Sequence, residues 1–319
     1  ALPWLGLLLL AWWGISGGSD RWEALRRWSL AAAAFVWLGL GADSWHRVTD
    51  RAEGLTVYFL DVGQGDAAAV RTPLGHWILI DGGPVGDGWD AGRRIVRPFL
   101  QQHRVSRLAV AVLSHAHADH LGGLATVLEE TDAGRVLDPG MLSADGLYGG
   151  FLAELDAREI PWQVADSGLT FVLDSLRFTV LHPRPGWSQW QEDLNENSLV
   201  LLLEYQGFRV LFMGDAGIPA EMELAGEVGP VDVLKVGHHG SRWATGDAWL
   251  EEVKPRVAVL SLGKRNRYGH PHRETLERLQ HHGVPAWRTD IEGTITVQVT
   301  GGVASVAGTH SHLTLDPRH

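Results

Sequence analysis

The chain has 319 residues, of which 45% are hydrophobic and 20% are charged, so it can bury the core of one large domain with an appendage. Its net charge of -11 argues against a surface that coats nucleic acid throughout, although it is compatible with a local basic groove. Cysteine is absent, which excludes disulfides and thiolate metal ligands but not either redox compartment.

The first fifty residues contain two apolar blocks, at 3–15 and 28–42, with an arginine-rich, tryptophan-edged segment at 19–27 between them. Each block is shorter than the roughly 20 residues that span a bilayer unaided. Short arginine-rich loops stay cytoplasmic, so the second block is expected to cross outward. We therefore expect residues 1–50 to form transmembrane helical segments of the inner membrane, and residues 51–319 to form a domain on its periplasmic, extracytoplasmic face. The alternatives are soluble helices that dock on the domain, or a leader sequence.

The domain begins with strands predicted at 55–62, 67–72 and 77–80, followed by a helix at 91–102. Gln64 and Asp66 lie in a glycine-bounded turn. They are expected either at the rim of a pocket or, for the aspartate, as a support of the turn itself. Asp81 follows directly on the third strand, at its tip.

A dense group of metal-ligand side chains follows the buried strand predicted at 108–113. His115 and His117 occupy alternate extended positions, so they project to the same side and can share one ion. Asp119 and His120 come after the bend and are expected to reach a second ion. Imidazole and carboxylate donors suit zinc or another divalent transition metal. The alternative is a polar loop whose histidines are incidental.

The remainder of the domain alternates between strands and helices. An irregular loop at 183–193 contains Trp187 and Trp190, which either stack on bases or pin the loop. The remaining predicted elements are a helix at 121–130, a strand at 135–137, a helix at 148–158, strands at 162–164, 170–172, 176–182, 199–203 and 208–213, a helix that ends at about 225, a strand at 231–236, a helix between 241 and 257, a strand at 257–262, a helix at 273–282 and closing strands within 294–306.

Candidate ligands recur immediately after apolar strands: Asp81, the cluster at 115–120, Asp215 and His238. In layered α/β folds, sites assemble at strand tips. The mixture of hairpins and helices predicts two mixed sheets packed face to face with helices outside.

Several phrases of the sequence resemble a known family. The motif series of the metallo-β-lactamase αββα sandwich resembles the order found here: Asp81, the 115–120 cluster, Asp215 and His238. Several longer sequence motifs resemble the C-terminal domain of ComEC, the DNA uptake channel of natural transformation. The resemblance covers about 55–306, and the first fifty residues fit the end of the ComEC transmembrane bundle. The phrases are FLDVGQGD at 59–66, LIDGG at 79–83, NENSLV at 195–200, LKVGHHGS at 234–241 and YGHP at 268–271.

The resemblance implies a role for each ligand-type position. His115 and His117 would hold a first ion, while Asp119, His120 and His238 would hold a second. Asp215 would bridge the two, and Asp81 would orient a ligand histidine. His239 would line the pocket, although the choice between His238 and His239 as the ligand stays open.

The first metal site differs from the general pattern of the fold. Its third histidine is missing, and Asn197 stands in that part of the pattern. A more oxygen-rich site makes Mn²⁺ as plausible as Zn²⁺, with Mg²⁺ possible. Two divalent ions are expected, and a single-metal enzyme is the alternative.

Two divalent ions can neutralise the anionic oxygens of a phosphodiester and activate water, so no protein nucleophile is needed. Asp119, Lys264 and His270 are the expected catalytic residues. Lys264 would bind phosphate together with Arg265 and Arg267, unless this is a solvated basic turn. His270 or His272 would protonate the leaving oxygen or stabilise the transition state, and the resemblance favours His270.

The expected function is that of a metal-dependent hydrolase: a nuclease that degrades the non-transported DNA strand during competence. Its expected partners are single- or double-stranded DNA, the membrane through the N-terminal segment, and the rest of the uptake channel. One alternative is an extracellular phosphodiesterase acting on a small or lipid phosphoester. The other is a non-catalytic DNA-guiding module of the channel.

Overall fold

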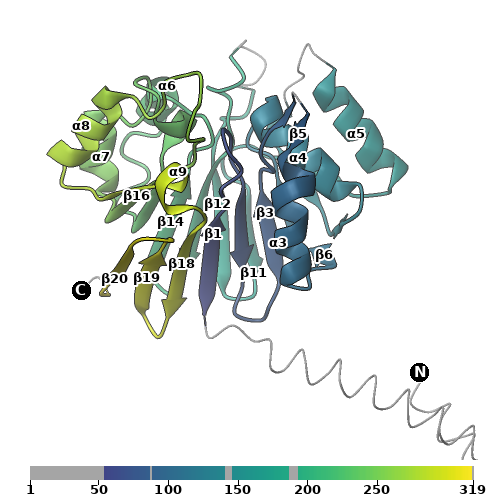
Figure 1. The fold of residues 1–319 in the computed structure, drawn as a ribbon, viewed down its shortest axis with the longest axis horizontal. Coiled ribbons are helices and arrows are strands. Elements are labelled where there is room, and N and C mark those ends of the chain that lie inside the picture. The colour runs from purple at the N-terminus through teal and green to yellow at the C-terminus, as the bar shows by residue number, and fades with distance from the viewer. Residues whose placement is uncertain (1–53, 87, 141–145, 187–192, 318–319) are drawn as a thin grey trace, which may run out of the picture. The chain divides into compact units, whose positions relative to one another are not determined.

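A computed structural model describes residues 54–86, 88–140, 146–186 and 193–317 (Figure 1). The chain divides into two units, Ala1–Arg51 and Ala52–His319, and all described residues belong to the second. The hydrophobic segment predicted at 1–50 therefore lies outside the described residues, as do Trp187 and Trp190. Those expectations, and the division at residue 50, stay predictions.

The larger of the two main sheets has nine strands, and it mixes parallel and antiparallel neighbours. Three consecutive neighbours in its order, β9, β7 and β3, run parallel, so their carboxyl ends lie at one edge. In spatial order the strands are β10 (Trp162–Val164), β9 (Val136–Asp138), β7 (Val110–Val112), β3 (Trp77–Ile80), β2 (Ala68–Arg71), β1 (Leu55–Phe59), β18 (Ile295–Thr300), β19 (Val303–Ala307) and β20 (His312–Leu315).

The second sheet has seven strands and is also mixed: it starts as antiparallel hairpins and ends as parallel strands joined by helices. In spatial order its strands are β11 (Thr170–Leu173), β12 (Leu176–His182), β13 (Val200–Tyr205), β14 (Phe208–Phe212), β15 (Val233–Lys235), β16 (Val257–Leu260) and β17 (Ala286–Arg288).

Helices cover the outer face of each sheet (Figure 1). On the first sheet, Leu121 and Leu124 of α4 join the same buried cluster as Leu79 and Ala111 of the strands. Leu250 of α7 belongs to the corresponding cluster of the second sheet. The helices on the first sheet are a π-helical turn (Gly92–Val96), α3 (Arg97–Gln102), α4 (Ala118–Leu128) and α5 (Leu147–Ala157); those on the second are α6 (Ile218–Glu223), α7 (Asp247–Val253) and α8 (Arg273–His281).

The main core lies between the sheets and follows the two-residue period of the strands. In β3 and β7, Ile78 and Val110 face this core, whereas Leu79 and Ala111 face the helices. Because both faces of these strands are buried, their sequences are continuous apolar runs. The predicted αββα sandwich of two mixed sheets is confirmed.

Several local predictions are corrected. The helix predicted from residue 121 begins at Ala118, so Asp119 and His120 lie in its first turn and not in a preceding bend. Two short strands, β4 (Val85–Gly86) and β5 (Trp89–Asp90), form a hairpin that the sequence did not predict, because two-residue strands show no periodicity. Other elements of two to four residues, which are too short to show a clear period, were also missed: β6 (Arg107–Leu108), β8 (Asp132–Ala133), β17, α9 (Thr289–Glu292) and β20.

None of the helices in the described ranges combines the length and the apolar character needed to cross a membrane.

Candidate metal centre

The candidate ligands gather where strands of both sheets end. Asp81 follows β3 and His115 follows β7, which is the parallel neighbour of β3. Asp215 follows β14, and His238 and His239 follow its parallel neighbour β15. Since parallel neighbours end at the same edge, two pairs of strand tips bring these residues together from positions far apart in the sequence.

Four buried or half-buried side chains point their donor atoms at one another. Nε2 of His120 lies 3.3 Å from Oδ1 of Asp215, and Nε2 of His239 lies 3.4 Å from Oδ2 of the same carboxylate. Oδ2 of Asp119 is 3.5 Å from Nε2 of His239. Among the described residues, His115, His120 and Asp215 form one group with donor atoms within 4.8 Å of one another, and Asp119, His120 and His239 form a second.

The unpaired atoms of this group fit a metal ion. Nε2 of His120, Oδ1 of Asp215 and Nε2 of His239 are all buried, and none of them makes a hydrogen bond. Buried polar atoms are almost always paired, so three facing one another within a short distance are an arrangement that a cation satisfies. A set of imidazole nitrogens and carboxylate oxygens is the donor chemistry of divalent metal ions.

His115 and His117 lie together, as the sequence predicts, and His115 also belongs to the donor group of His120 and Asp215. Nε2 of His115 lies 3.0 Å from Nδ1 of His117 and 4.0 Å from Oδ2 of Asp215. His117 belongs to none of the groups of three that the described residues form. These two histidines therefore extend the donor cluster on the side of Asp215.

The residue beside His115 is Ser198 and not the Asn197 of the prediction. Nδ2 of Asn197 donates to the backbone oxygen of Asp193, so its amide serves the preceding loop. Oγ of Ser198 lies 3.4 Å from Nδ1 of His115 and accepts the backbone N–H of Asp215. In place of a third histidine, the structure has a small hydroxyl that positions the backbone of Asp215.

His239, and not His238, lies among the donors. Both residues have positive φ values, 47° for His238 and 54° for His239, and Gly240 continues the turn at 85°. The resemblance implied His238 and left the choice between the two histidines open, and this left-handed turn aims the second imidazole, His239, inward. The His239 side chain is 2% exposed, whereas that of His238 is 31% exposed, with its Nε2 3.8 Å from Oδ2 of Asp215. His238 belongs to no group of three donors among the described residues.

Asp81 holds one side of the centre in place. Its Oδ1 accepts the backbone N–H of Ser114, and its Oδ2 accepts the Ser114 hydroxyl, both at 2.7 Å. The same Oδ2 lies 2.9 Å from Nδ1 of His120. This contact assigns the Nδ1 proton and leaves Nε2 of His120 directed at the centre, which is the support predicted for Asp81.

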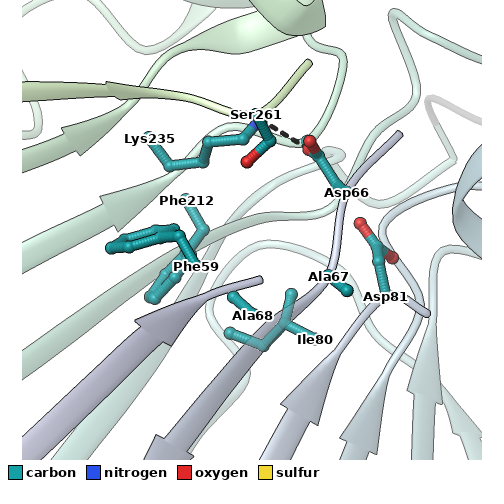
Figure 2. A pocket seen from close by; sticks show the side chains of 10 residues that line it. Phe59, Asp66, Ala67, Ala68, Ile80, Asp81, Phe212, Lys235 and Ser261 are labelled. Carbon is teal, nitrogen blue, oxygen red and sulfur yellow. Dashed lines mark hydrogen bonds and ion pairs between the residues drawn. The ribbon is translucent and has the colours of Figure 1, made fainter. Parts of the chain in front are cut away.

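Asp66 supports the other side, with a partner that the sequence analysis missed. Its Oδ1 lies 3.2 Å from Nδ1 of His239, and its Oδ2 accepts a hydrogen bond of 2.5 Å from Nζ of Lys235 (Figure 2). Nδ1 of His239 is also 3.0 Å from the backbone oxygen of Ser261. Lys235 is a charged residue inside an apolar strand, which is a signal that could have identified it, since lysine is almost never fully buried unless it is paired.

A cavity of about 10 Å³ lies beneath the centre, between the two sheets (Figure 2). Asp66, Asp81 and Lys235 line it on the polar side, and Phe59 and Phe212 line it on the apolar side. Both supporting carboxylates are therefore withdrawn from bulk water. This burial strengthens their interaction with the histidines that they orient.

The centre pairs buried carboxylates with imidazoles. Burial alone would lower the pKa of His120 and His239, but for each the neighbouring carboxylates, Asp215 first, outweigh burial and hold the pKa well above its ordinary value. Burial alone would raise the pKa of Asp215, but His239 and His120 hold it well below its usual range. Asp119 is shifted in the same direction by the same two imidazoles. The carboxylates are thus ionised and able to act as ligands at neutral pH.

His270 lies at the mouth of the centre, near the position expected of it. Its ring centroid is 5.6 Å from that of His238 and 6.1 Å from that of His239. Burial, and then the charges of His239 and His238, lower the pKa of His270 to about 4. At neutral pH this imidazole is uncharged and can donate an N–H hydrogen bond.

An open cleft of about 530 Å³ leads away from Asp119. Gln64, Arg265 and Arg267 line it, whereas the exposed Lys264 is not among its lining residues. Burial raises the pKa of the nearby Asp61, and the charge of Lys264 only partly opposes that rise. Oε1 of Gln64 accepts a hydrogen bond from the backbone N–H of Gly263, at the start of the loop 263–270 that carries the basic residues. Gln64 therefore lies at the rim, as predicted, and two of the three basic residues face the cleft.

Two of the glycines in the motifs are explained by close packing. A Cβ atom on Gly65, which has φ of +142°, would lie 2.3 Å from the backbone oxygen of Asp119. A Cβ atom on Gly82 would lie 1.9 Å from the backbone nitrogen of Leu124. Any side chain there would push α4, which carries Asp119 and His120, out of place.

The family to which this chain is similar is consistent with a metal centre at this position. Residues 76–260 match the family model described as a beta-lactamase superfamily domain, which covers more than half of the chain. The chain belongs to the metallo-β-lactamase superfamily. Its fold is similar to that of CmlA, a diiron β-hydroxylase from Streptomyces venezuelae, with a TM-score of 0.53 and 18% identity over 78% of this chain and 55% of CmlA. At that identity the likeness shows the fold alone.

Relatives with higher sequence identity confirm the resemblance to the ComEC family. The chain is 30% identical over 253 residues to ComE operon protein 3 of Bacillus subtilis, which covers 75% of this chain and 32% of that protein. It is 31% identical over 255 residues to competence protein ComA of Neisseria gonorrhoeae, covering 78% and 32%. The chain thus spans about a third of the length of these relatives.

Proposed function

We propose that this superfamily member is a nuclease that cleaves phosphodiester bonds of the DNA strand that is not transported during competence. The observation that carries the proposal is the position of Asp119. Its side chain belongs to the buried donor group, and it also lines the open cleft that contains Arg265 and Arg267. A phosphodiester backbone bound along that cleft would meet the donor group directly.

Divalent ions held by His115, Asp119, His120, Asp215 and His239 would supply positive charge against the phosphate oxygens and lower the pKa of a water molecule. The chain's own contribution is to hold those donors rigidly. Asp81 fixes the ring of His120, and Asp66 fixes the ring of His239. Such carboxylate support typically accounts for 10–100-fold in metal affinity.

His270 is proposed to act on the substrate and not on the ions. Its ring stands at the mouth of the centre beside His238 and is stacked on Tyr268 of the cleft, with centroids 5.8 Å apart. From there its N–H would donate a hydrogen bond to the leaving oxygen or to a phosphate oxygen. Lys264 is exposed at the edge of the same loop and would add positive charge along the approach of the DNA.

The location proposed for the protein follows from its relatives and from its first fifty residues. One relative is named competence protein ComA, and the apolar blocks at 3–15 and 28–42 fit the end of a membrane bundle. We propose that the domain is held at the inner membrane on its extracytoplasmic face, with the rest of the uptake channel as its partner. Protease protection in membrane vesicles tests this orientation, and a domain protected on the cytoplasmic side would contradict it.

A nuclease assay tests the activity. The full chain, purified without chelator in mild detergent, is given Mn²⁺, Zn²⁺ or Mg²⁺ with single-stranded DNA, double-stranded DNA and a chromogenic phosphodiester. We expect the wild type to cleave DNA and His120→Ala to lose this activity. His281→Ala should keep it, because His281 is exposed on α8.

Two other outcomes would contradict the nuclease. Cleavage of the chromogenic ester alone would favour a phosphodiesterase for small substrates, for which the net charge of -11 is better suited. Bound metal with no hydrolysis of any substrate would favour a non-catalytic DNA-guiding module. Metal content by mass spectrometry separates this case from a protein that has lost its ions, and one ion per chain would contradict the two-ion site.

A further inference from the structure

We propose that the cleft beside Asp119 binds a single strand of nucleic acid, with an unpaired base stacked on Trp89 and Tyr268 and a phosphate held by Arg265. This inference rests on the proposed function, because it assigns a substrate form to the same site. It is carried by the β4–β5 hairpin, which the sequence did not predict, and by the loop at 263–270.

The two walls of the cleft come from distant parts of the chain. Val85 and Trp89 of the β4–β5 hairpin line one part, and Arg265 and Tyr268 of the loop line another. The turn that carries Gln64 also lines it. The cleft of about 530 Å³ is within the range of small-ligand pockets, and it opens onto the donor group through Asp119.

The hairpin is anchored on the helix that carries Asp119. A Cβ atom on Gly122 would lie 2.8 Å from Cβ and 3.0 Å from the backbone nitrogen of Val85, so β4 packs closely against the first turns of α4. The loop is anchored on the Gln64 turn in the same way, since a Cβ atom on Gly263 would lie 2.9 Å from the Gln64 nitrogen. Both walls are thus fixed relative to the donors by direct backbone contact.

Each wall presents an exposed aromatic ring next to a guanidinium group. Trp89 is 39% exposed, and Cζ of Arg94 lies 5.0 Å from its ring centroid. Tyr268 is 50% exposed, and the neighbouring Arg267 lies over its ring at 5.2 Å and donates to its hydroxyl. Large aromatic side chains are usually buried, so two exposed rings lining one basic cleft indicate a surface for a flat partner.

This chemistry favours an unpaired strand over a duplex. Aromatic rings bind nucleic acid by stacking on the faces of bases, which in a duplex are covered by their neighbours. Arginines beside the rings bind the phosphates of the nucleic-acid backbone and add cation–π contacts. Duplex binding relies instead on phosphate contacts and groove readout, to which exposed tryptophan and tyrosine rings contribute little.

The test measures binding without metal, so that it does not depend on hydrolysis. The full chain in mild detergent with EDTA is titrated into a fluorescein-labelled oligothymidylate of about twelve nucleotides, a length within the usual site size of single-strand binders. We expect Trp89→Ala and Tyr268→Ala each to raise the dissociation constant about tenfold, since one lost stacked base is worth that much. Trp89→Phe and Tyr268→Phe, which keep a ring, should recover most of the affinity.

The salt dependence of the affinity distinguishes the contribution of Arg265 from that of the two aromatic rings. Arg265→Ala should lower the slope of log affinity against log salt by about 0.7, the value for one phosphate contact to a single strand. Trp89→Ala and Tyr268→Ala should leave that slope unchanged. Trp162→Ala is the matched control, because Trp162 on β10 is 42% exposed and does not line the cleft. Arg107→Ala, exposed on β6, is the control for charge.

Any of three results would overturn the single-strand site: wild-type affinity in both ring-to-alanine variants, equal losses in the Trp162 control, or a blunt duplex of the same length bound as tightly as the single strand. Cleavage of DNA by the metal-loaded wild-type chain is measured in parallel. Failure of that reaction counts against the proposed function, whereas failure of the binding test with hydrolysis intact counts against the cleft alone.

Discussion

The two ends of the site differ in how their residues are held. At the buried end, Asp119, His120, Asp215 and His239 face one another, and further carboxylates orient both imidazoles. At the open end, Trp89, Arg265 and Tyr268 are exposed and line a cleft. Substitutions at the first end should therefore change metal binding and stability, and substitutions at the second should change only what the cleft holds.

The largest effect is expected from Asp215→Asn. The Asp215 carboxylate is 2% exposed and lies between His120, His239 and His115, so an amide would remove the negative charge that these three imidazoles face. We expect loss of bound metal and a fall in hydrolysis on the order of 10³-fold or more. Metal content by mass spectrometry and hydrolysis of the chromogenic phosphodiester measure it. Asp247→Asn, in the exposed first turn of α7, is the control, and unchanged metal content in Asp215→Asn would contradict the centre.

Lys235→Met should cost stability and not only activity. The lysine and Asp66 are 4% and 8% exposed, and removing one partner leaves a buried carboxylate without its counter-charge. We expect the free energy of unfolding to fall by about 3–5 kcal/mol. Denaturant unfolding measures the change, with Arg273→Met as a comparison that should show no measurable loss, because its pair with Glu277 is exposed. A wild-type midpoint in Lys235→Met would show that the pair does not support the fold.

Glu221 gives a pH dependence that arises away from the metal donors. Burial outweighs its hydrogen bonds from Gly246 and Thr245 and raises the pKa of this carboxyl from 4.5 to about 7. Because the folded-state pKa is raised, its contribution to stability is complete below about pH 4.5 and is lost as the pH rises through 7. We expect the stability of the wild type relative to Glu221→Gln to fall by roughly 3 kcal/mol between pH 4.5 and 7.5. Parallel stability profiles for the two proteins would rule out this shift.

Asp81→Asn tests the support of His120. Asn tolerates the left-handed backbone of this position, φ 58°, and its single oxygen can still accept the backbone N–H of Ser114, but its NH2 group cannot replace the oxygen that faces His120. We expect metal affinity to fall by about 10–100-fold with little change in the fold. Calorimetric titration with Zn²⁺ and Mn²⁺ measures the affinity, and circular dichroism checks the fold. Unchanged affinity would mean that Asp81 serves only the backbone of Ser114.

The smallest effect on stability is expected at the open end. Trp89 is 39% exposed on a two-residue strand, so Trp89→Ala should change the free energy of unfolding by less than about 1 kcal/mol. Denaturant unfolding measures it beside Lys235→Met. A loss as large as that of the buried lysine would show that the ring supports the fold and would remove the contrast between the two ends.

Local sequence pattern was enough for the sandwich and for most of the ligands. Apolar runs such as 108–113 specify strands buried on both faces, and the cluster that begins at His115 follows within a few residues. The pattern also placed Asp81 and Asp215 at strand tips, where the structure has them. It failed for the helix start at Ala118 and for the hairpin at Trp89, because a helix can begin without a typical capping residue and two-residue strands carry no period.

Periodicity and residue type along the chain were sufficient for the longer strands, the αββα layers and a set of imidazoles and carboxylates at strand tips, since these depend on short-range pattern. The tertiary structure decided that His239 turns inward, that Lys235 pairs with Asp66 across 169 positions of the chain, and that Trp89 shares a cleft with Tyr268. Those outcomes depend on a left-handed turn and on packing between segments remote in the chain, which no local pattern records.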